Sequence, residues 1–127
     1  MEVVAVDAEE LHRRAQQALS MNLHGEAQRL CEEALAACPE NVDYQAICLW
    51  IRAQARGADL TALVVELDVL LADNADHVAS RYYRGMLRRR LGTEAAARMD
   101  FERVLSIDSG HSGARQQLAE MKTSKRA

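Results

Sequence analysis

The stretch Leu87–Asp108, LRRRLGTEAAARMDFERVLSID, decides the fold because its 22 residues contain a helix, a turn and a second helix. The first run of helix-forming residues stops at Gly92, and glycine readily adopts the left-handed conformation that ends a helix. Thr93 and Glu94 follow, a hydroxyl residue and an acid of the kinds preferred where a helix begins. The stretch therefore predicts a helical hairpin with a very short turn.

The spacing of this hairpin recurs along the chain at an interval of 35 residues. Residues that are 35 positions apart share a small, apolar or turn-forming character. Three such sets are Asn22, Gly57 and Gly92; Ala27, Ala62 and Ala97; and Leu35, Leu70 and Leu105. Self-similarity at a fixed interval is typical of stacked repeats. We therefore expect one domain with repeats at about 8–42, 43–77 and 78–112, a capping helix at about 112–123, and flexible tails at 1–6 and 124–127.

Composition favours an almost wholly helical protein. The 127 residues include one proline and six glycines, and 49% are apolar, which is enough to bury a core. In the middle repeat, leucines from Leu60 to Leu71 form one broad apolar face, and Val65 and Val69 add a second. We therefore expect this helix to be covered on both sides.

The third repeat resembles the tetratricopeptide repeat (TPR) family. That family has a small residue in the first helix, glycine at the turn, alanine where the helices touch, then an aromatic and a small apolar residue, and finally proline after the second helix. The first five positions hold, in order, Gly85, Gly92, Ala97, Phe101 and Val104, and Ser109 stands where proline is usual. The first repeat matches with Ala15, Asn22, Ala27, Ala34 and Pro39, and has Cys31 in place of the aromatic. The resemblance implies an all-α, right-handed α-hairpin solenoid of about seven helices.

The middle repeat departs from this pattern. Trp50 stands where the family keeps a small residue, and Glu66 stands where it keeps an aromatic. An indole does not fit a close helix contact built for glycine or alanine. We therefore expect the first helix of this repeat to be rotated or displaced.

Catalytic and metal-binding patterns are missing from the sequence. Its four histidines are scattered, and it contains no H-E-x-x-H, C-x-x-C or glycine-rich phosphate loop. Cys31 and Cys38 share a helical face, but seven residues of helix separate their Cα atoms by ~10 Å, too far for a disulfide. We therefore expect no enzymatic activity, no metal and no cofactor, and small core residues at these cysteines.

Localisation follows from what the chain lacks. Three cysteines fit no disulfide framework and indicate a reducing compartment. No apolar stretch approaches the ~20 residues that a membrane-spanning helix needs, and the N-terminus has no signal-peptide pattern. We expect a cytoplasmic protein that binds no membrane, and the high alanine and arginine usage hints at a bacterial source.

The TPR resemblance also implies a binding surface. First helices of the family line a concave groove that holds an extended or helical peptide of a partner protein. The corresponding residues here are His12, Gln16, Tyr44, Ile47, Ile51, Tyr82, Met86 and Arg90. An exposed apolar strip of this kind indicates a contact site. Core packing is an equal alternative for Ile47 and Met86, whereas the hydroxyls of Tyr44 and Tyr82 favour the groove.

One variant of the family uses Lys, Asn and Arg in this groove to bind the C-terminal carboxylate of chaperones. The corresponding positions here hold His12, Gln16, Cys48, Ala79 and Tyr83. Those cationic and amide groups are therefore missing, and we expect no recognition of that terminal motif.

Charge is distributed unevenly. Residues 1–77 contain 5 Lys and Arg against 14 Asp and Glu, whereas residues 78–127 contain 11 against 5. A basic ridge formed by Arg81, Arg84, Arg88 and Arg89 explains part of this asymmetry. Three interpretations of this ridge are open. Its arginines could pair with acidic residues of neighbouring helices, contact an acidic segment of a partner, or bind nucleic acid. The net charge of −3 and the lack of an aromatic platform disfavour nucleic acid.

The sequence thus predicts a non-enzymatic protein–protein interaction module that binds a peptide or helix of a partner protein. Two alternatives stay open. One is a small bacterial TPR chaperone or co-chaperone segment that shields an apolar client segment. The other is a self-associating scaffold, for example a homodimer.

Overall fold

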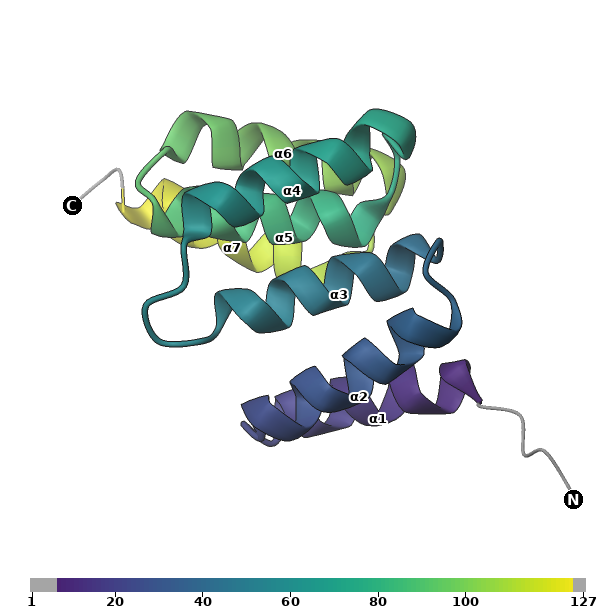
Figure 1. Cartoon of the computed structure of the whole chain (residues 1–127). Coiled ribbons are helices and arrows are strands. Elements are labelled where there is room, and N and C mark those ends of the chain that lie inside the picture. Colours follow the sequence, from purple (N-terminus) through teal and green to yellow (C-terminus); the bar gives the residue numbers. More distant parts are fainter. Residues whose placement is uncertain (1–6, 125–127) are drawn as a thin grey trace, which may run out of the picture. The chain divides into compact units, whose positions relative to one another are not determined.

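The computed structural model describes residues 7–124, which form seven α-helices and, within that range, no β-strand (Figure 1). The helices are α1 (Ala8–Ser20), α2 (His24–Ala37), α3 (Val42–Ala53), α4 (Leu60–Asp73), α5 (Val78–Arg90), α6 (Glu94–Ile107) and α7 (Ser112–Ser124). The predicted all-α class and number of helices are confirmed. The expected flexible tails fall outside the described residues, apart from Ser124.

Two of the predicted turns have the expected backbone. Asn22 and Gly92 have φ angles of 61° and 85°, in the left-handed region. At the end of α5, the N–H of Thr93 donates to the carbonyl of Arg88 at 2.9 Å, and the N–H of Gly92 to that of Arg89 at 3.1 Å. This pair of hydrogen bonds satisfies carbonyls that a helix end would otherwise leave unpaired. The turn residues therefore end α1 and α5 as the repeat predicts.

The middle repeat ends its first helix differently. Gly57 also has a positive φ, 78°, but α3 already stops at Ala53. The side-chain amide of Gln54 donates to the carbonyl of Trp50 at 2.9 Å and occupies a helix-end acceptor. Gly57 therefore belongs to a separate turn rather than to the helix end.

Helices α1, α3, α5 and α7 each begin at a polar side chain. Asp7, Asn41, His77 and His111 each accept a hydrogen bond from the backbone N–H three residues later, at 3.0 to 3.2 Å. Such caps stabilise helix starts. This capping role explains two of the four scattered histidines, whereas Thr93, at the predicted start of α6, makes no such side-chain hydrogen bond.

The helices fall into two compact units that divide between Ala58 and Asp59, so α1–α3 belong to the first unit and α4–α7 to the second. In the first unit, Ala15 of α1 and Ala27 of α2 are fully buried in one hydrophobic core. Alanines at these positions let two helices approach closely. The division falls inside the second predicted repeat.

In the second unit, Gly85 of α5 lies directly against Phe101 of α6. A Cβ atom on Gly85 would lie 2.7 Å from Cε1 of Phe101, whose side chain is fully buried. Ala97 and Val104 are buried in the same cluster. The pattern that suggested the TPR resemblance therefore describes real packing between α5 and α6.

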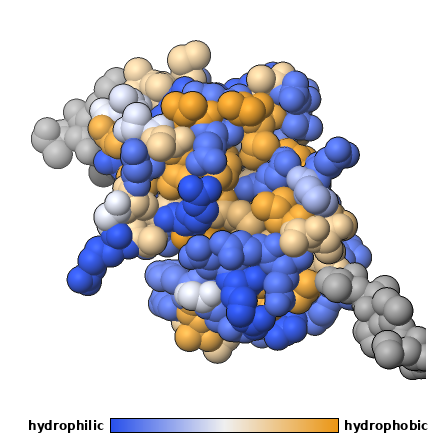
Figure 2. Space-filling view, viewed as in Figure 1, coloured by the Kyte–Doolittle hydropathy of each residue, from blue (hydrophilic) through white to orange (hydrophobic). Residues whose placement is uncertain are grey.

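The expectation that α4 is covered on both sides is wrong. Leu63, Leu67 and Leu71 are its buried residues, whereas Val65 and Val69 are 55% and 62% exposed. One leucine stripe supplies all of the helix's buried face, so the valines are left at the surface. Figure 2 shows hydrophobic residues gathered at the surface over α4 and α6.

Candidate partner-binding surfaces

On the first unit, α1 presents His12 and Gln16 one helical turn apart. The ring of His12 packs against the ring of Tyr44 with centroids 4.8 Å apart and planes inclined by 37°. His12 is half-buried and Gln16 is exposed. The Nδ1 atom of His12 is buried and has no hydrogen-bond partner among the described residues. This surface therefore combines an aromatic pair with an accessible amide.

Burial lowers the pKa of His12 below its ordinary value of 6.5, and attraction to Asp43 offsets this only in part. The imidazole is therefore neutral at neutral pH. A neutral ring on this surface offers no cation to a carboxylate ligand.

Acidification is expected to destabilise the protein through His12. Because its pKa is lower in the folded than in the unfolded chain, the unfolded chain takes up more protons as the pH falls through 6.5. The free energy of unfolding should therefore fall between about pH 7 and pH 5 in the wild type, and fall less in His12→Gln. Urea unfolding at each pH measures this. The exposed His24→Gln change is the matched control, and an equal pH slope in wild type and His12→Gln would contradict the expectation.

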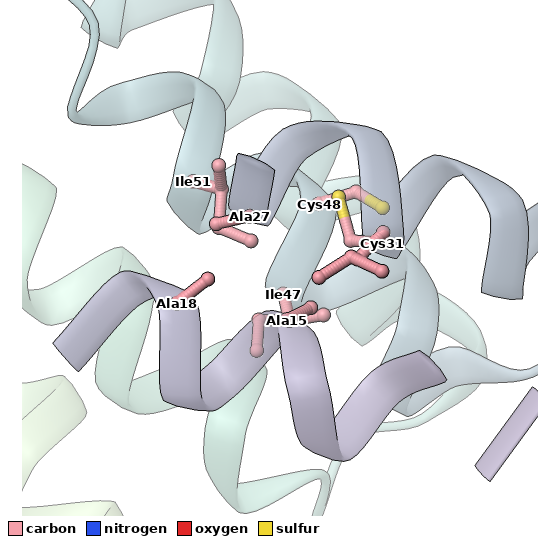
Figure 3. Close-up of a cluster of buried hydrophobic side chains, with 8 residues drawn as sticks. Ala15, Ala18, Ala27, Cys31, Ile47, Cys48 and Ile51 are labelled. Carbon is pink, nitrogen blue, oxygen red and sulfur yellow. The ribbon is translucent and has the colours of Figure 1, made fainter. Parts of the chain in front are cut away.

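Three predicted groove residues on α3 lie in the core of the first unit. Tyr44, Ile47 and Ile51 are only 7%, 3% and 2% exposed. Ile47 and Ile51 pack with the alanines of α1 and α2 in the cluster shown in Figure 3. Their side chains stabilise helix packing in the free protein, and periodicity alone does not distinguish that role from a groove role.

On the second unit, Tyr82 and Met86 of α5 are half-buried beneath α7. Both pack against the core cluster formed by α6 and α7. The Tyr82 ring lies 4.7 Å from the ring of His111, and a Cβ atom on Gly113 would lie 2.7 Å from the Tyr82 hydroxyl oxygen. Helix α7 therefore covers part of both predicted anchors and leaves the rest at the surface.

Arg89 and Arg90 end the same helix in different environments. Nη1 of Arg89 donates to Oε1 of Gln117 at 2.6 Å and to Oε2 of Glu120 at 2.7 Å. Arg89 therefore ties α5 to α7. Arg90, the last residue of α5, is exposed.

The rest of the basic ridge surrounds a buried carboxylate that sequence reasoning missed. Asp100 of α6 is 1% exposed. Arg84 donates to both of its oxygens, from Nε at 3.0 Å and from Nη2 at 2.7 Å, and Arg88 donates from Nη1 at 3.0 Å. Arg81 lies 3.7 Å from the same carboxylate, and Arg84 also bonds Asp68 of α4 at 2.8 Å.

These contacts give the ridge a partner within its own unit. Burial acts to lower the pKa of Arg84, but hydrogen bonds to Asp100 and Asp68 outweigh it, and the pKa is raised. The guanidinium is therefore held in its charged form. A pocket of about 640 Å³ lies beside the network, lined in part by Arg81, Arg88 and Met99. Contact with an acidic partner segment stays a prediction, and the pairing within the unit is observed.

Across residues 7–124, no group of three or more His, Cys, Asp or Glu side chains is arranged to hold a metal ion. None of the seven helices is both long and apolar enough to cross a membrane.

No family model matches the chain, and no curated protein matches its sequence. Solved structures do match it. The first TPR of Spaghetti (RPAP3) bound to the HSP90 peptide SRMEEVD is 18% identical, with a TM-score of 0.72 over 100% of this chain and 99% of that one. The first TPR domain of human RPAP3 is 19% identical, with a TM-score of 0.73 over 91% and 90% of the two chains.

The chain has the TPR fold. In the first unit α1 and α2 form a helical hairpin, in the second unit α5 and α6 form another, and α7 packs against α6. At 18% and 19% identity the likeness concerns the fold, and the binding properties of this chain depend on its own residues.

Proposed function

We propose that this TPR chain is a non-enzymatic interaction module that binds a peptide or helix of a partner protein on the first helices of its hairpins. The fold is the observation that carries the proposal. A structural neighbour with the same fold over the whole chain is bound to a peptide.

The residues available for such binding lie on α1 and α5. His12 and Gln16 on α1, and Tyr82, Met86 and Arg90 on α5, are spaced by four residues within each helix, which places them on one face. All five are half-buried or exposed. Their aromatic rings, the methionine thioether and the polar ends of the side chains suit a peptide that offers both apolar side chains and backbone hydrogen-bonding groups. Each unit thus has its own contact surface.

A selected peptide tests the proposal without a known partner. Random peptides displayed on phage are selected against the full chain, and the best binder is titrated into the ¹⁵N-labelled protein. We expect amide shifts on α1 or α5, and for a peptide that shifts α5 we expect Arg90→Glu to weaken binding about tenfold, the equivalent of about 1.4 kcal/mol. Arg98→Glu on α6 is the matched control. Shifts confined to α2, α4 and α6, or failure to select any peptide, would overturn the proposal.

The HSP90 peptide SRMEEVD is expected not to bind. A carboxylate clamp needs charged donors, whereas His12 is neutral near pH 7 and Cys48 is 7% exposed within the core. Titration calorimetry should therefore show a dissociation constant weaker than about 1 mM, or a binding free energy smaller than about 4 kcal/mol. The same peptide with an amidated C-terminus is the control. Micromolar binding that amidation abolishes would show that a clamp exists.

Self-association is a second candidate, favoured by the exposed valines of α4. Val65 and Val69 lie one turn apart and are 55% and 62% exposed. Pairing of two copies along this strip would remove the valines from water. Light scattering at high concentration would then show a dimer in the wild type and a monomer in the Val65→Glu, Val69→Glu variant. A monomeric wild type at about 1 mM would exclude a dimer with micromolar affinity.

A further inference from the structure

Two cysteines from different helices meet inside the first unit. Cys31 of α2 and Cys48 of α3 belong to the same hydrophobic cluster and are 1% and 7% exposed. Each thiol shifts the pKa of the other. Figure 3 shows the two sulfur atoms beside one another between the helices. Partner binding on α1 or α5 makes no use of this pair.

The two thiols are chemically unequal. The hydrogen bond with Cys48 and burial both raise the pKa of Cys31, whose S–H also contacts the carbonyl of Gln28 at 3.2 Å. The interaction with Cys31 lowers the pKa of Cys48; burial and the negative charge of Glu32 oppose this, and Arg52 adds a smaller lowering effect. Cys48 is also the more exposed of the two. Thiolate character and access both make Cys48 the residue that an oxidant attacks first.

We propose that Cys31 and Cys48 form a reversible intramolecular disulfide, made by hydrogen peroxide and undone by a dithiol reductant, that links α2 to α3. The pair differs from Cys31 and Cys38, because Cys38 lies just past the end of α2 and, contrary to the expectation of a core residue, is exposed. A disulfide requires Cα atoms within about 7 Å. Two neighbouring thiols on adjacent helices meet this requirement far more readily than two cysteines seven residues apart in sequence.

The oxidation proceeds in two steps. The Cys48 thiolate attacks one oxygen of hydrogen peroxide, the O–O bond breaks, and the departing hydroxide takes up the proton that the thiol released, giving water and a sulfenic acid. The Cys31 sulfur then attacks the Cys48 sulfur, the S–O bond breaks, and the hydroxide leaves with the Cys31 proton as a second water. Two thiols lose two electrons, and one peroxide gains them.

The disulfide would join the first hairpin to the helix that follows it. Cys31 and Cys48 are 17 residues apart, so the bond closes a short loop of the unfolded chain. Loops of this length stabilise a folded state appreciably when the bond is unstrained, and we expect a melting temperature about 5–15 °C higher in the oxidised protein. Oxidation would then change the stability of the first unit rather than its partner surface.

The full chain carrying Cys38→Ser tests this, because Cys38 is exposed and would otherwise form disulfides between chains. After peroxide treatment and alkylation in denaturant, the expected mass is about 2 Da below that of the reduced chain, with no alkylation. Cleavage after glutamate separates the cysteines at Glu33 and Glu40, so the two fragments should stay linked until dithiothreitol is added. The wild-type chain, alkylated at Cys38 while folded, repeats the measurement without a substitution.

Single variants assign the two roles. In Cys31→Ser, Cys48 should form a sulfenic acid that dimedone traps, whereas in Cys48→Ser, Cys31 should react at least about tenfold more slowly. The proposal is overturned if the peroxide-treated chain keeps two alkylatable thiols. It is also overturned if both cysteines oxidise to sulfinic or sulfonic acids without a link, or if the only disulfides join separate chains.

Discussion

Replacing Phe101 by alanine is expected to lower the free energy of unfolding by about 3–5 kcal/mol, the largest effect of any core truncation in the second unit. Phe101 is fully buried in the cluster that joins α5, α6 and α7. Its ring also lies 5.9 Å from the ring of Tyr82. Removing the ring loses apolar burial and leaves a cavity that rigid helices refill poorly. Urea unfolding followed by circular dichroism measures the loss.

A substitution at Gly85 tests whether the destabilisation by Phe101→Ala reflects close packing rather than hydrophobicity alone. A Cβ atom on Gly85 would lie 2.7 Å from the Phe101 ring, so Gly85→Ala should destabilise by about 1–3 kcal/mol despite the better helix propensity of alanine. In a Phe101→Leu background the collision is relieved, and the penalty should shrink or change sign. Gly25→Ala is the matched control, because no described atom lies within 4 Å of its added Cβ. A stabilising Gly85→Ala in the wild type would contradict this account.

The parts of the fold that the sequence predicted are those decided by single local residues. Asn22 and Gly92 end helices because few other residues tolerate a positive φ, so their positions alone locate two hairpin turns. Phe101 and Gly85 are complementary in size, which makes their helix contact visible as a sequence pattern. Gly57 marks the limit of such reasoning, since its φ is positive but α3 already ends at Ala53.

The candidate site was predicted less well, because the outer and inner faces of a repeat helix have similar composition. Tyr44 and Ile51 have the spacing of groove residues, yet both are buried. Val65 and Val69 have the spacing of core residues, yet both are exposed. Which face of a helix is covered depends on neighbouring helices, and a single sequence does not specify their positions to within one side chain.

Asp100 was missed for the same reason, although a signal was present. It aligns with Leu30 and Val65 at the repeat interval, so it is a charge at an otherwise apolar position. A buried carboxylate needs compensating charge, and Arg84 and Arg88 stand one turn apart on the preceding helix. Those two facts together predict an ion network, whereas the ridge considered alone suggested a surface contact.

Replacing Arg84 by alanine is expected to lower the free energy of unfolding by about 3 kcal/mol, because it takes away the donor that contacts both oxygens of a buried carboxylate. Arg84 is 14% exposed and Asp100 about 2% at the side chain. Arg88 and Arg81 still compensate part of the Asp100 charge, so we expect the variant to stay folded at room temperature. Arg29→Ala is the matched control, since Arg29 pairs with Glu26 and Glu33 on an exposed helix face and should leave the urea midpoint nearly unchanged.

The double variant Arg84→Met, Asp100→Leu separates charge compensation from loss of side-chain volume. It removes the carboxylate together with its main donor and restores the apolar residue that the aligned positions hold. Buried ion pairs replaced by packed apolar groups are often neutral in stability. The double variant should therefore lie within about 1 kcal/mol of the wild type, well above Arg84→Ala. If it is as unstable as Arg84→Ala, then the arginine stabilises the unit by filling space, and the partner charges matter little.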